Sequence, residues 1–110
     1  MASRSVLVDL ADWTKLSTLI TAKNPNLGSL TNCQSINVES PETNADGTRV
    51  DITMDLVSKD PAYRLLKEED QLFESPLRSN NISTLDKLLR IVDNAGAVTA
   101  GKARITLNFA

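Results

Sequence analysis

The side chains of this sequence that could do chemistry are mostly carboxylates. The run Lys67-Glu68-Glu69-Asp70 has enough oxygen ligands for a hard cation. Successive positions of a helix point in different directions, so these oxygens would not converge on one ion, and a solvated helix face is the simpler interpretation. Asp51 and Asp55 share one face of a predicted strand but lie about 13 Å apart along it, which is too far for a pair of acid–base catalysts.

The composition excludes most other catalytic and metal chemistry. The 110 residues contain no His and a single Cys, Cys33, which has no neighbouring base to activate it and is interpreted as a small buried hydrophobe. A Ser-His-Asp or Cys-His nucleophile, an imidazole metal site, a multi-cysteine zinc site and an internal disulfide are therefore all excluded. We expect a protein that is not an enzyme, with no catalytic residue, no metal ion and no cofactor.

The polar faces of the predicted strands carry the remaining candidate site, a surface for RNA. Short hydrogen-bonding side chains with a few cations suit contacts with sugar and phosphate. Asp51 and Asp55 lie among these side chains and would repel phosphate, and a solvated sheet face is the alternative interpretation. The candidate RNA-binding residues are Ser35, Asn37, Arg49, Thr53, Arg104, Thr106 and Asn108.

The length and charge of the chain indicate one ordinary domain. A sequence of 110 residues, with 41% hydrophobic and 24% charged residues, is expected to form a single domain over residues 1–110. Its apolar runs are short and its N-terminus lacks the apolar stretch of a signal peptide, so we expect no membrane span and a place inside the cell. The net charge of −2 argues against strong non-specific binding of nucleic acid.

Alternating apolar residues predict the strands that would position these side chains. The pattern is clearest at Val50, Ile52, Met54 and Leu56, which are predicted to share the covered face of one strand. The segment Asn44–Gly47 predicts a hairpin turn before that strand, because its glycine accepts the positive φ that such a turn needs. The predicted strands cover residues 5–10, 34–39, 49–56 and 104–109, and the last of them is expected to be paired.

Helical periodicity predicts two to three helices. One helix is expected over residues 61–75, opened by Asp60-Pro61, and a second between a capping box at 83–86 and a stop signal at 94–96. Residues 11–23 favour a third helix, and a strand is the alternative there. The apolar stripes are Leu65, Leu66, Leu72 and Phe73; Leu85, Leu88, Leu89 and Val92; and Trp13, Leu16, Leu19 and Ile20.

This order of elements predicts an α+β fold. The expected architecture is an antiparallel β-sheet with two to three helices packed on one face. A split βαββαβ arrangement, as in ferredoxin-like proteins, is the simplest way to connect these elements.

Two segments resemble the coat proteins of single-stranded RNA bacteriophages, in the permuted, levivirus-like branch in which a strand follows the helices. Asp12–Thr18 reads Asp-Trp-Thr-Lys-Leu-Ser-Thr, which is similar to an Asp-x-Thr-basic-Leu-Ser-Thr segment near the N-terminus of that branch. Asn94-Ala95-Gly96 recurs in a similar place after the helical region. The size of the chain and its Ser/Thr/Asn-rich strands also agree with the family.

The resemblance implies a structural role. The protein would form an intertwined homodimer with a shared antiparallel sheet, and its helices would lie over the partner subunit. Such dimers would tile an icosahedral shell, and the polar sheet face would contact packaged RNA. The chain departs from the family in being shorter, net acidic and helical in pattern at residues 11–23, and its acidity opposes the RNA contacts most directly.

We therefore expect a viral coat subunit that self-assembles in the host cytoplasm and is found in the virion. Its partners would be copies of itself and the single-stranded RNA genome, with no membrane. Amphipathic helices and exposed sheet edges support self-assembly independently, because identical subunits can bury such surfaces against one another. The alternative is a stand-alone ferredoxin-like module that binds a small ligand or a protein partner.

Overall fold

The computed structural model of the chain describes residues 2–27, 33–74 and 86–109. In this part of the chain the regular structure is mostly β, with eight strands, one α-helix and one short 3₁₀ helix. In chain order the elements are β1 (Ala2–Leu10), β2 (Thr14–Lys15), α1 (Leu16–Lys23), η1 (Pro25–Leu27), β3 (Cys33–Glu39), β4 (Arg49–Ile52), β5 (Tyr63–Leu65), β6 (Asp70–Glu74), β7 (Leu88–Val92) and β8 (Gly101–Phe109).

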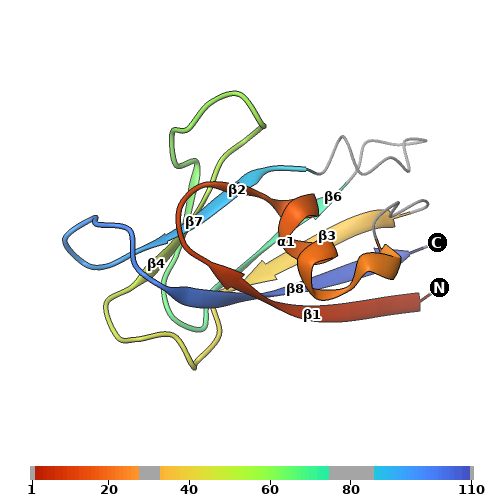
Figure 1. Cartoon of the computed structure of the whole chain (residues 1–110), viewed down its shortest axis with the longest axis horizontal. Helices are drawn as coiled ribbons and strands as arrows, with labels where there is room; N and C mark the ends of the chain where they lie inside the picture. Colours follow the sequence, from red (N-terminus) through yellow and green to blue (C-terminus); the bar gives the residue numbers. More distant parts are fainter. Residues whose placement is uncertain (1, 28–32, 75–85, 110) are drawn as a thin grey trace.

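The strands pair in a nested order. β1 pairs with β8, β2 with β7, β3 with β6 and β4 with β5, and every pair is antiparallel. Two further pairings, β3 with β8 and β4 with β7, join these four pairs of strands into two four-stranded sheets. The first sheet has the order β1-β8-β3-β6 and the second sheet β2-β7-β4-β5 (Figure 1). Eight antiparallel strands nested in this way over two sheets form a jelly roll.

The core lies between the inner faces of the two sheets. Alternate residues of each strand turn inward, as antiparallel sheets with one covered face require. α1 packs against β1 and adds its own apolar side chains to the same cluster. The largest fully buried side chains are Leu16 and Ile20 of α1, Val8, Ile36, Val38, Ile105 and Leu107 of the first sheet, and Val50, Ile52, Leu89 and Ile91 of the second sheet.

The predicted α+β fold is wrong. A single sheet with two to three helices on one face is replaced by two sheets and one helix of eight residues in the described chain. The intertwined, sheet-sharing dimer belonged to that architecture and is not retained. The ferredoxin-like arrangement is also excluded, because its strands would form one sheet.

The helices predicted over 61–75 and 83–96 are wrong: the described residues of these ranges form the strands β5, β6 and β7 with turns and irregular segments beside them. Leu65 and Phe73 are buried but Leu66 and Leu72 are exposed, so the four residues do not form one covered stripe. β7 has buried apolar residues on both sides of its one polar residue, Arg90, so its sequence shows no clear alternation of buried and exposed residues. Residues 75–85, with the predicted helix end before Pro76 and most of the capping box, lie outside the described residues.

The predicted hairpin around Gly47 is wrong in its pairing, although its turn is confirmed. Gly47 has a φ of +83°, as expected for the turn. However, β3 and β4 belong to different sheets, so the segment between them crosses from one sheet to the other. Asn44 fastens this crossing to β8: its side-chain amide donates to the Lys102 carbonyl at 2.8 Å and its side-chain carbonyl accepts from the Lys102 N–H at 2.8 Å.

Residues 11–23 contain both of the alternatives that the sequence left open. Thr14-Lys15 forms the short strand β2, and α1 follows directly. Leu16, Leu19 and Ile20 are buried, as the predicted stripe requires, and the helix ends before Asn24-Pro25 as expected. The strand predictions at residues 5–10, 34–39 and 104–109 are confirmed as β1, β3 and β8.

Candidate functional site

Five of the seven predicted RNA-binding residues lie together on the outer face of the first sheet. Ser35 of β3 is paired with Asn108 of β8, and Asn37 of β3 with Thr106 of β8. The Asn108 amide donates to the Ser35 hydroxyl at 2.9 Å. Arg104 continues the same face one row further along β8. The structure therefore groups these five side chains, and Asn108 and Ser35 use part of their hydrogen-bonding capacity on each other.

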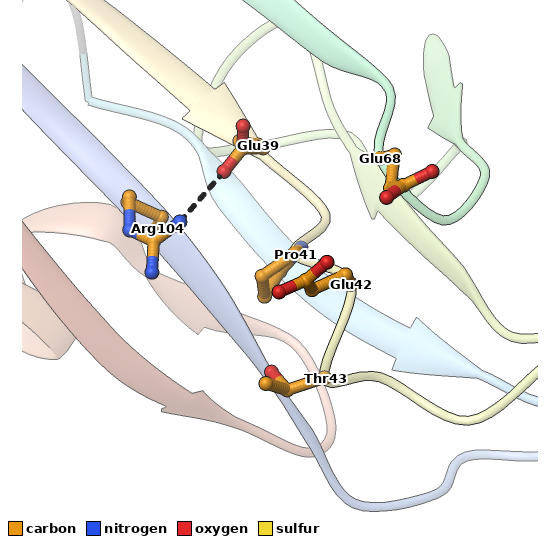
Figure 2. A pocket seen from close by; sticks show the side chains of 6 residues that line it. All are labelled: Glu39, Pro41, Glu42, Thr43, Glu68 and Arg104. Carbon is orange, nitrogen blue, oxygen red and sulfur yellow. Dashed lines mark hydrogen bonds and ion pairs between the residues drawn. The ribbon is translucent and has the colours of Figure 1, made fainter.

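Carboxylates surround this polar face. Arg104 donates to Glu39 at 3.0 Å, and the two side chains border a depression of about 250 Å³. Figure 2 shows Glu39, Glu42 and Glu68 in the lining of this depression, which contains one guanidinium group, that of Arg104. Two more carboxylates, Asp70 and Glu74, stand on the adjacent strand β6. A phosphate approaching this face would meet more negative than positive charge.

A second depression, of about 520 Å³, lies at the end of the first sheet where segments 43–45 and 100–102 meet Asp9 and Leu10. Asp9 is paired with Lys102 and Lys23, and these two ammonium groups lower its pKa to about 2. Its charge is thus already neutralised within the protein. The rest of the lining is largely backbone and aliphatic side chain, which supplies no convergent polar groups for a small ligand.

The other two predicted residues lie at the second sheet, Arg49 in β4 and Thr53 directly after it. Thr53 is buried, accepts from the Leu88 N–H at 3.0 Å and donates to the Asp55 carbonyl, so its hydroxyl is structural. Arg49 lies on the outer face of β4, and its Nε is buried without a hydrogen-bond partner among the described residues. The predicted RNA surface is therefore divided between two sheets.

Arg49 and Asp51 share their sheet face with two arginines, Arg64 and Arg90, that the sequence analysis missed. Asp51 of β4 is paired with Arg90 of β7 on one side and Arg64 of β5 on the other, so the three side chains form one row across the sheet. Arg90 Nε lies 3.0 Å from Asp51 Oδ2, and Asp51 is only 1% exposed. The Arg90 guanidinium also lies 4.5 Å from the centre of the Trp13 ring, a cation–π distance. We call these five residues the arginine face.

A loop that exposes apolar side chains joins β4 to β5. Residues 53–62 protrude beyond the second sheet, as the green loop in Figure 1 shows. Met54 is 59% exposed, Leu56 38% and Val57 89%. The prediction that Met54 and Leu56 share a covered strand face is therefore wrong, because β4 ends at Ile52. We call residues 53–62 the apolar loop.

Hydrogen bonds hold the apolar loop in place. The Asp55 carboxylate accepts from the N–H groups of Val57 at 2.8 Å and Ser58 at 3.0 Å, and these bonds lower its pKa. Lys87 donates to the Met54 carbonyl at 2.8 Å, and desolvation lowers the pKa of this lysine. These bonds hold the backbone that carries the exposed apolar side chains, and large apolar side chains are more often covered.

Comparisons with protein-family models, with curated proteins and with solved structures found no match. None of the helices in the described chain has the length and apolar character needed to cross a membrane. Residues 2–27, 33–74 and 86–109 contain no group of three or more His, Cys, Asp or Glu side chains placed to hold a metal ion. The fold and the two surfaces define the chain as an all-β jelly-roll protein with one arginine-bearing sheet face and one exposed apolar loop.

Proposed function

We propose that this protein is a viral coat subunit that associates with copies of itself into a closed shell. The observation that supports this most directly is the apolar loop. Val57 and Met54 are strongly exposed, yet the backbone that carries them is held by side-chain hydrogen bonds. A fixed and exposed apolar surface of this kind is typical of a protein–protein contact.

The jelly roll supports the same proposal by analogy. This fold is used by viral capsid proteins, and also by lectins and cupins, so it does not decide the function alone. The shell that we propose differs from the one implied by the RNA-phage resemblance. Its subunits would contact one another through loops and sheet edges rather than through helices laid over a shared sheet.

Self-association through the apolar loop is favourable for a physical reason. Burying apolar surface contributes about 25 cal/mol per Å². Hydrogen bonds already hold the loop backbone, so association loses less conformational entropy there. More of the free energy of apolar burial then contributes to affinity. A closed symmetric shell repeats the contact at every subunit, so even a weak pairwise contact can stabilise the whole.

The proposed location is the virion, and the proposed site of assembly is the host cytoplasm. Packaged single-stranded RNA would be the second partner. The polar face with Ser35, Asn37, Arg104, Thr106 and Asn108 is not the RNA contact that we propose, because the carboxylates beside these residues repel phosphate.

Electron microscopy of the protein expressed alone tests the proposal. The wild-type protein is expected to form closed particles, and Val57→Asp to lose them, because a buried carboxylate in the contact would weaken association by about tenfold or more. Val98→Asp is the matched control, since Val98 is an exposed valine in the turn region after β7. A monomer in the wild-type sample, or equal loss of particles in both variants, would contradict the proposal.

A further inference from the structure

We infer that the arginine face binds single-stranded nucleic acid. This inference deepens the proposed coat function by placing its RNA contact on the second sheet, and it rests on that proposal only for the choice of RNA as the ligand. The binding itself is a property of Trp13, Arg49, Arg64 and Arg90 and is tested separately from assembly.

The geometry places the cations on one surface. Arg90 and Arg64 flank Asp51 from the two neighbouring strands, so their backbones lie about 10 Å apart across the sheet. Arg49 lies two residues before Asp51 on the same face of β4. Arg64 is exposed and Arg49 and Arg90 are partly exposed, although the Nε atom of Arg49 is buried.

The balance of charge favours a polyanion. Three guanidinium groups stand around one carboxylate on the arginine face, and Lys15 adds an exposed ammonium group from β2, opposite Leu88. In the described chain Arg90 is the only one of the three arginines in an ion pair. The face therefore retains positive charge that no described side chain neutralises.

The outer face of the first sheet has the opposite balance. Its cations, Lys102 and Arg104, are both paired with carboxylates. Its carboxylates are more numerous than its cations and comprise Asp9, Glu39, Asp70 and Glu74. A polyanion would therefore be attracted to the second sheet and repelled from the first.

The residue types favour nucleic acid over an acidic protein. A planar guanidinium group can donate two parallel hydrogen bonds to one phosphate, which makes arginine the preferred residue for phosphate recognition. Trp13 adds a partly exposed aromatic ring in contact with Arg90, and bases of single strands stack on such rings. Asp51 is a positioning residue, because its carboxylate holds Arg90 at 3.0 Å.

Trp13 also provides the assay, because it is the only tryptophan in the chain. A twelve-nucleotide oligouridylate is titrated into the full-length protein, and binding is followed both by Trp13 fluorescence and by the anisotropy of a labelled oligonucleotide. We expect saturable binding that weakens with salt. Three phosphate contacts on a single strand predict a slope of about −2 in log K against log salt concentration.

Arg64→Glu and Arg104→Glu form a matched pair of charge reversals on the two sheets. Both arginines are exposed, so neither substitution disturbs the core, and Arg64→Ala serves as a milder second variant. We expect Arg64→Glu to weaken binding about tenfold or more and Arg64→Ala to weaken it less. Both variants lose one guanidinium–phosphate contact, but only the glutamate also repels the phosphate. Arg104→Glu should leave the affinity within about twofold of wild type.

Three results would overturn the inference. They are no binding by the folded wild-type protein at low salt, an equal loss in the Arg64 and Arg104 variants, and displacement of the oligonucleotide by polyglutamate at the same concentration of charge. The last result would assign the face to an acidic protein. Particles that form without binding RNA would contradict this inference alone, and RNA binding by a protein that forms no particles would contradict the coat proposal alone.

Discussion

Asp86 shows how a single residue outside a helix can stabilise it. Its carboxylate accepts from the Ser17 N–H at 3.0 Å and from the Ser17 hydroxyl at 2.8 Å. Ser17 lies in the first turn of α1, where N–H groups have no partner within the helix, and Lys15 at the N-cap makes no side-chain hydrogen bond to them. The sequence predicted that Asp86 caps a helix that follows it in the chain. In the structure its carboxylate caps the first turn of α1 instead.

Asp86→Ala is therefore expected to lower the free energy of unfolding by about 1–2 kcal/mol, as loss of an N-terminal cap does. Urea denaturation followed by circular dichroism measures the change. Asp12→Ala is the control: Asp12 accepts only from the N–H of the next residue in an exposed turn, and its loss should change stability by less than about 0.5 kcal/mol. Equal effects of the two substitutions would show that Asp86 has no special role.

The burial of an individual residue was predictable where the polarity of its side chain alone decides it. Cys33 is buried, as its interpretation as a small hydrophobe requires, and desolvation raises the pKa of its thiol. Arg90 and Arg64 were missed because each was assigned to a helix, where neighbours three or four residues away share a face. If this segment had been assigned to a strand, the apolar neighbours Leu89 and Ile91 would have been expected to point inward and Arg90 outward.

At the scale of elements, a triad of charges fastens α1 to the first sheet. Asp9 of β1 lies 2.7 Å from Lys23 of α1 and also pairs with Lys102 of β8. The two lysines lower the pKa of Asp9 from 3.8 to about 2, so folding favours its charged form. The stabilisation is therefore fully present above pH 3.8 and is lost as the pH falls through about 2.

Asp9→Asn tests this link. The variant is expected to unfold at a lower temperature than wild type near neutral pH, and the difference should shrink towards zero as the pH falls to about 2. Thermal unfolding between pH 7 and pH 2 measures it. High salt should also reduce the difference, because the three side chains are substantially exposed to solvent. A difference that is as large at pH 2 as at pH 6 would rule out the charge interaction as its cause.

Strands were predictable where one of their faces is buried in the core and the other is exposed to solvent. β1, β3 and β8 alternate cleanly, so their strand period is visible in the sequence. β7 has buried residues on both faces. β5 and β6 belong to different sheets and follow each other after a short turn, so their apolar residues fall by chance at helical spacing. Tertiary packing decided these segments against their local pattern.

At the scale of the whole molecule, the topology depends on contacts that local patterns do not reveal. β1 begins at Ala2 and pairs with β8, which ends at Phe109, so the outermost strand pair brings the first and last strands together. Turn signals indicate neighbouring strands, and the Gly47 turn accordingly suggested a hairpin where the chain in fact crosses between sheets. The nested pairing follows from how the sheets close on one core, which the sequence pattern alone does not specify.

The same topology separates the two proposed contacts. The apolar loop extends beyond the second sheet, whereas the arginine face covers the outside of that sheet and the carboxylates lie on the first sheet. One contact would therefore join subunits, and the other would hold RNA, without competing for the same side chains. A shell around RNA needs one surface for contacts between subunits and another for contacts with RNA, and the apolar loop and the arginine face would provide them.

Sedimentation velocity of the purified wild-type protein, over a hundredfold range of concentration, tests the central proposal of self-assembly most directly. We expect a discrete species of many subunits that persists on dilution and that Val57→Asp converts to monomer, whereas Val98→Asp leaves it intact. A single monomeric species at every concentration, in the wild-type protein as in the variants, would contradict the account.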